Sequence, residues 1–111
     1  MQILIHTRDS NLASDLLGRS HVHAGDEIEL DHGVSLTYKG SQVQRSFGLP
    51  EIVMLSVAIP TGIVAGIFAN WLWEKLKNHS IVRIEIDRTT VEFEEGEIKR
   101  AIHERVTKTG N

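Results

Sequence analysis

The stretch "IVMLSVAIPTGIVAGIFANWLW" (52–73) contains no charged residue, and its placement decides the fold of the 111-residue chain. As one helix it would be long enough to cross the hydrocarbon core of a bilayer, which takes about 20 apolar residues. Tryptophans and lysines follow one another at its C-terminal end, as they do at a membrane interface. Gly62 and Gly66 form a G-x-x-x-G spacing, which lets two helices approach closely in lipid.

Other features of the same stretch favour two pieces of a soluble domain. Pro60 would kink a continuous helix but fits the first turn of a helix that begins beside it. Asn70 would be costly in lipid without a partner. We therefore expect a short apolar element at 51–58 and a helix at about 60–77. A narrow stripe of this helix is expected to lie against a sheet: Gly62, Gly66, Ala69 and Trp73.

The rest of the chain is expected to supply that sheet and two more helices. Alternation of polar and apolar residues predicts a strand at 2–6, hairpins at 27–40 and 81–94, and a further strand at 42–47. Helical spacing of apolar residues predicts helices at 9–18 and 95–108. If 52–73 entered a bilayer, it would separate these strands onto opposite sides of the membrane.

The predicted fold class is α+β, in one domain that covers residues 1–111. It is a small mixed or antiparallel sheet of two hairpins plus an N-terminal strand. A long central apolar helix and a C-terminal amphipathic helix cover this sheet.

Composition narrows the classes of function and the cellular location. Twelve Lys and Arg stand against 15 Asp and Glu, and the formal net charge of -3 argues against a nucleic-acid partner. The chain has no cysteine, which excludes disulfides and thiolate metal sites. The first residues lack the long apolar region of a signal peptide. We expect a cytoplasmic protein; insertion of 52–73 would instead place it in the inner membrane.

The densest group of possible metal ligands lies in "HVHAGDEIELDH" (21–32). His21 and His23 would point to the same side of an extended segment, and Asp26 could complete a metal site. The turn chemistry of Asp31-His32-Gly33 explains the same region as a solvated hairpin. We favour the solvated hairpin and expect no cofactor.

No catalytic residue is predicted, because the sequence contains no nucleophile elbow, phosphate loop or dinucleotide loop. His6 and Asp9 have the residue types of a base and its orienting carboxylate, but a strand-end histidine and a helix cap explain them more simply. Trp71 and Trp73 lie two residues apart and face different sides of a helix. We expect one of them in the core and the other exposed, as part of a partner-binding surface.

The C-terminal half also resembles a known family. A helix that ends in "ANWLWEKLK" (69–77) is followed by the strand–turn–strand "IVRIEIDRTTVEFE" (81–94) and by a helix with an acidic start. Over residues 55–108 this layout is similar to the effector-associated constant component, a small soluble domain of bacterial conflict systems. The resemblance implies an adaptor or recognition module beside effector enzymes, and it carries over no catalytic residue.

Three functions remain open at this point. The preferred one is a non-enzymatic interaction or adaptor module of a bacterial conflict or defence system, which acts through a protein partner or through self-association. Trp71 and Trp73 are its candidate contact residues. The first alternative is a small membrane-anchored or pore-forming effector with 52–73 as its transmembrane helix. The second is a metal-dependent hydrolase that uses His21 and His23.

Overall fold

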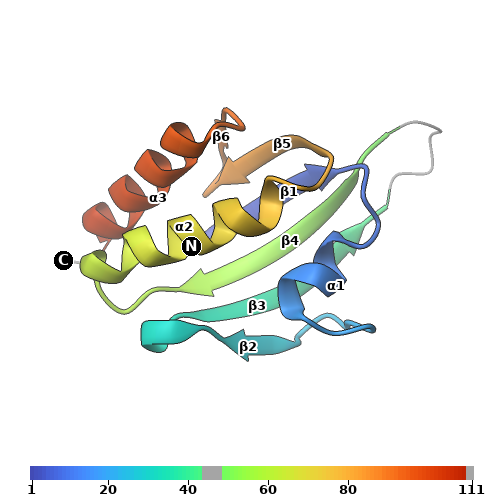
Figure 1. Ribbon diagram of the computed structural model, residues 1–111, viewed down its shortest axis with the longest axis horizontal. Helices are drawn as coiled ribbons and strands as arrows, with labels where there is room; N and C mark the ends of the chain where they lie inside the picture. Colours follow the sequence, from blue (N-terminus) through green and yellow to red (C-terminus); the bar gives the residue numbers. More distant parts are fainter. Residues whose placement is uncertain (44–48, 110–111) are drawn as a thin grey trace.

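The computed structural model describes residues 1–43 and 49–109 of the chain. Within these ranges, six strands and three α-helices follow one another with one short 3-10 turn (Figure 1). Their order is β1 (Gln2–Thr7), α1 (Leu12–Leu17), β2 (Glu27–Glu29), η1 (Asp31–Gly33), β3 (Ser35–Gln42), β4 (Glu51–Ala58), α2 (Gly62–Leu76), β5 (Ile81–Ile86), β6 (Thr89–Val91) and α3 (Glu95–Thr109).

The stretch 52–73 is divided into two pieces, as the position of Pro60 predicts, and the short apolar element at 51–58 is a strand. β4 ends at Ala58 and α2 begins at Gly62, with Ile59, Pro60 and Thr61 between them. Among the described residues, no helix combines the length and the apolarity that crossing a membrane requires. Residues 52–73 therefore do not form the one continuous helix that the membrane alternative expects.

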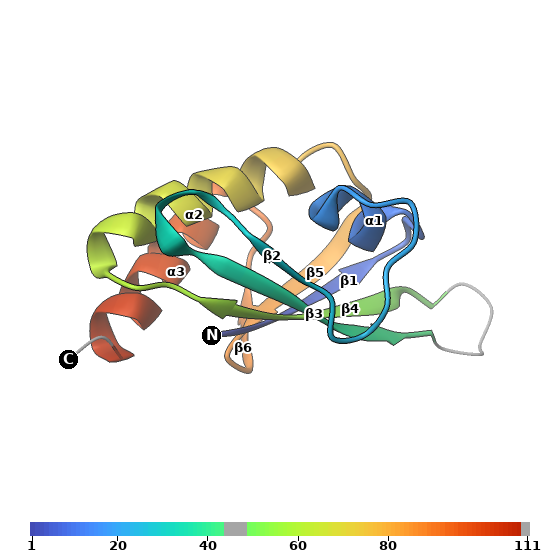
Figure 2. The same ribbon diagram turned by 90° about the horizontal axis from the view of Figure 1, so that it is seen from below.

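The strands form one antiparallel sheet in the order β2-β3-β4-β1-β5-β6. β1 lies between β4 and β5 and pairs with both, so the first residues of the chain sit at the centre of the sheet. Figure 2 shows α1 and α2 on one face of this sheet, and α3 packs beside α2. The predicted α+β class and both predicted hairpins are confirmed. Of the further strand predicted at 42–47, Gln42 ends β3 and residues 44–47 lie outside the described part of the chain.

β4 is a strand because its sequence alternates with period two. Val53, Leu55 and Val57 are buried toward the helices, whereas Ile52 and Met54 on the opposite face are only half-buried. Pairing with β1 on one side and β3 on the other satisfies its backbone groups. The sheet edges are short, since β2 and β6 contain three residues each, which limits the backbone that another strand could pair with.

The orientation of α2 differs from the predicted one. The residues that α2 packs toward the sheet are Ala65, Phe68, Ala69, Leu72 and Leu76. Of the predicted stripe, Ala69 is buried and Trp73 half-buried, but Gly62 and Gly66 are exposed. A Cβ atom added at either glycine would meet no other atom within 4 Å. The large side chains decide the orientation, because they bury far more apolar area than a glycine can.

A two-residue turn joins β5 to β6, and its backbone is left-handed at both positions. Asp87 has a φ of 47° and Arg88 a φ of 70°, as in a type I′ turn. The Asp87 carboxylate accepts hydrogen bonds from the backbone N–H of Gln2 at 2.8 Å and from Nε of Arg105 at 2.9 Å. The turn is thereby tied to β1 and to α3.

Candidate interaction surface

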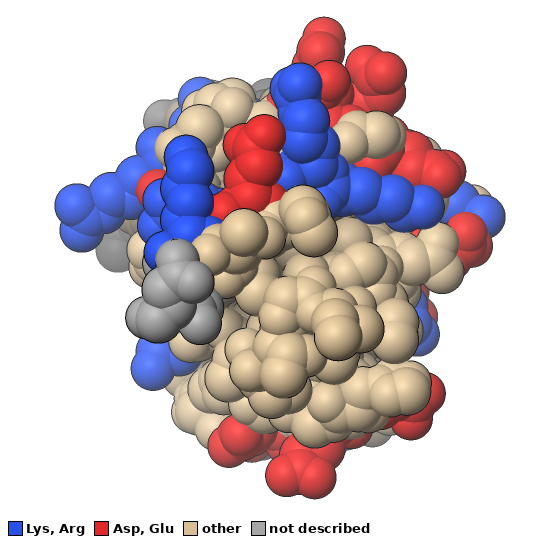
Figure 3. All heavy atoms as spheres, turned by 90° about the vertical axis from the view of Figure 1, so that its left-hand side faces the viewer, with Lys and Arg blue, Asp and Glu red and all other residues tan. Residues whose placement is uncertain are grey.

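The exposed residues of α2 between its first residue and Asn70 share one side of the helix. We name this side the α2 outer face: Gly62, Ile63, Gly66, Ile67 and Asn70. Residues three or four positions apart lie on the same side of a helix, which places these five residues together. Ile63 is 89% exposed and Ile67 is 44% exposed. Figure 3 shows a broad uncharged surface over the end of the molecule at which α2 begins, with charged side chains gathered above and below it.

The positions of these exposed apolar side chains are more unusual than their number. Single exposed apolar side chains are normal on a protein surface. Here two isoleucines lie one helical turn apart, and Gly66, the exposed residue between them, has no side chain, so no charged group separates them. A contiguous apolar patch of this kind marks an interaction site more often than chance exposure.

A groove runs along the α2 outer face between α2 and the β2–η1 segment. We name it the α2–β2 groove, and its cavity volume is about 440 Å³. Its lining residues are Glu29, Leu30, Asp31, Val34, Ile67, Phe68, Asn70, Trp71 and Glu74. Val34 and Phe68, each 1% exposed, form the floor. The floor is therefore apolar and contains no charged group.

Carboxylates mark the rim of the groove. Glu29 and Asp31 are exposed on one side, and Glu74 lies on the α2 side. Glu74 forms an ion pair with Lys77, with Nζ and Oε2 2.6 Å apart. Within the described part of the chain, no Lys or Arg side chain forms an ion pair with Glu29 or Asp31. The groove is thus apolar inside and acidic along its β2–η1 side, whereas on the α2 side Lys77 pairs with Glu74 and Lys99 donates to Asn70.

The two tryptophans have similar burial but different surroundings. Trp71 lines the α2–β2 groove and stacks on Phe68, with ring centroids 5.9 Å apart. Trp73 packs against Phe93, with centroids 5.1 Å apart. Both are half-buried and pack against the core. The prediction of one core and one exposed tryptophan is wrong, because α2 presents both indoles obliquely at its flanks. Trp71 alone lines the groove.

The predicted metal ligands lie in the loop before β2. His21 and His23 are exposed. The Asp26 carboxylate accepts the backbone N–H of His23 at 2.9 Å and lies 3.6 Å from a guanidinium nitrogen of Arg19. In the ranges that the structure describes, no three His, Cys, Asp or Glu side chains are grouped closely enough to hold a metal ion.

An ionic cluster that sequence reasoning missed lies at the other end of α2. The ring of His79 contacts Asp9 through Nδ1 and Asp15 through Nε2, the latter at 2.7 Å. Burial lowers the pKa of His79, but hydrogen bonds and charges from Asp15 and Asp9 outweigh it, so this pKa lies above its usual value. The backbone N–H of Asn11, followed by the His79 ring, holds the pKa of Asp9 below its usual value.

His6 in β1 has a partner other than Asp9. Nε2 of His6 lies 2.7 Å from the Glu85 carboxylate, whereas Asp9 contacts His79. The hydrogen bond from His6, together with Arg83, holds the pKa of Glu85 below its usual value. No local spacing in the sequence could have found these pairs, because 79 residues separate His6 from Glu85 and 70 separate Asp9 from His79.

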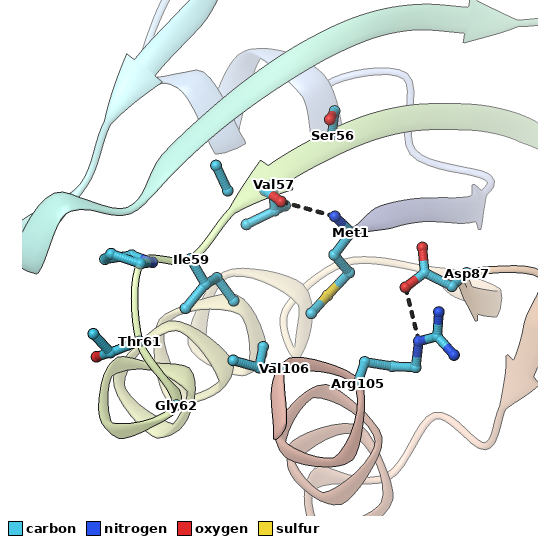
Figure 4. Close-up of a pocket in the computed structure, with 11 residues that line it drawn as sticks. Met1, Ser56, Val57, Ile59, Thr61, Gly62, Asp87, Arg105 and Val106 are labelled. Atoms are coloured by element: carbon cyan, nitrogen blue, oxygen red, sulfur yellow. Dashed lines mark hydrogen bonds and ion pairs between the residues drawn. The ribbon is translucent and has the colours of Figure 1, made fainter. Parts of the chain in front are cut away.

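A second cavity, of about 640 Å³, lies where β4, α2 and α3 meet. Figure 4 shows the Met1 side chain pointing into it, with the Asp87–Arg105 ion pair at one side. Burial raises the pKa of Asp87, but the N–H of Gln2 and the Arg105 guanidinium outweigh this effect and lower it. The charges at this cavity are engaged with each other and stabilise the fold.

Comparison with protein-family models, with curated proteins and with solved structures finds no match. The resemblance of residues 55–108 to the effector-associated constant component stays a prediction.

Proposed function

We propose that this chain is a non-enzymatic interaction module that docks another polypeptide on the α2 outer face and the adjoining α2–β2 groove. The observation that carries the proposal is the exposure of Ile63 and Ile67, 89% and 44%, on a helix face without a charged residue. In a helix that serves only the fold, large apolar side chains such as these are expected to be buried against the sheet.

The energetics of burial support a docking role. Moving one large aliphatic side chain from water into an interface yields about 1.5–3 kcal/mol. Ile63 and Ile67 together could therefore anchor a partner. Trp71, at the edge of the same surface, adds a side chain of the type that most often dominates binding energy.

The ion pairs of His79 and Arg105 support a structural role for these groups. His79 is held between two carboxylates, and Arg105 is paired with Asp87. Such contacts join α1 to the α2–β5 loop and the β5–β6 turn to α3. The resemblance described above would place the module in the cytoplasm, beside an effector enzyme of a bacterial conflict or defence system.

Quantitative capture from cells, with two matched variants, tests the proposal. Ile63→Lys adds a charge to the α2 outer face, and Val82→Lys adds the same charge to β5, where Val82 is 48% exposed. We expect captured proteins to be lost with Ile63→Lys and retained with Val82→Lys, at equal thermal stability. Sedimentation of the purified protein shows whether the captured polypeptide is a second copy. Equal capture by both variants would contradict the proposal.

A further inference from the structure

We propose that the α2–β2 groove binds a short basic amphipathic segment of a partner protein. This inference rests on the proposed function and names the chemistry of the partner. Apolar side chains of the segment occupy the groove between Ile67 and Trp71. Its Lys or Arg side chains pair with the carboxylates of Glu29 and Asp31.

The interior of the groove favours apolar side chains in the segment that binds there. Its floor consists of Val34 and Phe68, and Leu30, Ile67 and Trp71 form its walls. Sites for small polar ligands hold a few directed polar groups inside the pocket. Here the charged groups lie at the rim, so the groove suits the apolar face of a peptide helix.

The rim of the groove favours positively charged side chains in the segment that binds there. Glu29 and Asp31 are exposed and form no ion pair with a described Lys or Arg, so their charges act on whatever approaches. A negative rim attracts cationic side chains and speeds their association. It repels the phosphates of nucleic acids and of anionic lipids. Charge complementarity therefore selects a protein segment that carries Lys or Arg.

A pair of designed peptides provides the test. Each is a helical peptide of about 15 residues with leucine along one face. One carries lysine on the polar face and the other carries glutamate. Binding is followed by the fluorescence of Trp71 in a Trp73→Phe background, which keeps an aromatic ring against Phe93. We expect the lysine peptide to bind at least about tenfold more tightly than the glutamate peptide.

Two double variants of equal charge change locate the effect. Glu29→Gln/Asp31→Asn removes charges from the rim, and we expect about fivefold weaker binding of the lysine peptide and a flatter dependence on salt. Glu92→Gln/Glu104→Gln removes the same charge from exposed positions on and before α3, and affinity should not change. An equal loss in both double variants would overturn the inference, because it would show non-specific attraction.

Other outcomes separate this inference from the proposed function. If neither peptide binds, or both bind equally, while Ile63→Lys still abolishes capture from cells, the partner is not basic and only this inference fails. If Ile63→Lys leaves capture intact, the proposed function itself fails. A concentration-dependent dimer that Ile67→Lys dissociates would show that the groove holds a second copy, which also overturns the inference.

Discussion

Nε2 of His79 lies 2.7 Å from the carboxylate of Asp15, although 64 residues separate them in the sequence. Asp9 contacts the other ring nitrogen, so the His79 ring joins the segment after β1, α1 and the α2–β5 loop. The His79 side chain is only 11% exposed. This cluster fixes the position of α1 over the sheet and gives the fold a pH-dependent contribution to stability.

The pH dependence of that contribution has a definite sign. The raised pKa of His79 stabilises the fold fully below its unfolded value of 6.5, and the stabilisation is lost as pH rises through the folded pKa. The lowered pKa of Asp9 stabilises the fold above the unfolded value of 3.8, and the stabilisation is lost as pH falls through the folded pKa. We expect His79→Gln to cost about 1–2 kcal/mol between roughly pH 4 and pH 6.5.

Urea unfolding of wild type and His79→Gln across this pH range measures the difference. The two stabilities should converge above neutral pH and again in acid. A constant difference at all pH values would show that His79 contributes through packing and not through charge.

Gly66→Ala should stabilise the fold. The added methyl group meets no atom within 4 Å, and alanine favours a helix interior over glycine by about 0.5–1 kcal/mol. Gly18→Ala is the matched control, since it also meets open space but has a φ of 66°. It should lose stability, because alanine is strained in the left-handed region. Thermal melting of both variants measures these changes in stability. A destabilised Gly66→Ala would mean that Gly66 packs against neighbouring atoms.

The β5–β6 turn offers a further gain. Arg88 has a φ of 70° at the second position of a type I′ turn, where glycine is strongly preferred. Arg88→Gly should therefore raise the free energy of unfolding by about 0.5–1 kcal/mol. Arg88→Ala, which keeps the conformational cost, should give no such gain. Equal effects of the two substitutions would argue against the type I′ geometry.

Metal removal should leave the protein unchanged. The Asp26 carboxylate is held by the backbone N–H of His23 and lies near Arg19, and both histidines of the segment are exposed. Neither a chelator nor added zinc should shift the melting temperature. Saturable zinc binding that His21→Ala removes would revive the metal-site interpretation.

The sequence predicted much of the backbone because its signals there are local. Pro60 separated an apolar element at 51–58 from the following helix, although the sequence did not identify that element as the strand β4, and alternation placed a strand at 81–86. Which side of α2 packs on the sheet was harder to predict. Every side of the helix from Gly62 to Trp73 is uncharged, so the spacing of apolar residues does not single out a buried side. Burial of Phe68 and Leu72 decided it, and this depends on the shape of the sheet beneath.

The candidate site was predicted only in part for the same reason. Trp71 was identified by residue type, and it does line the α2–β2 groove. The acidic rim could not be foreseen, because Glu29 and Asp31 come from a hairpin far from α2 in the sequence. The His79 cluster likewise needs the folded chain to bring its members together.

Site-specific photo-crosslinking in cells tests the central claim most directly. A photoreactive residue replaces Ile63 or Ile67 on the α2 outer face, and Val82 serves as the control of comparable apolar exposure on β5. We predict discrete adducts with another polypeptide at 63 and 67 and none at 82. The absence of adducts at 63 and 67, or equal adducts at all three positions, would contradict docking through α2.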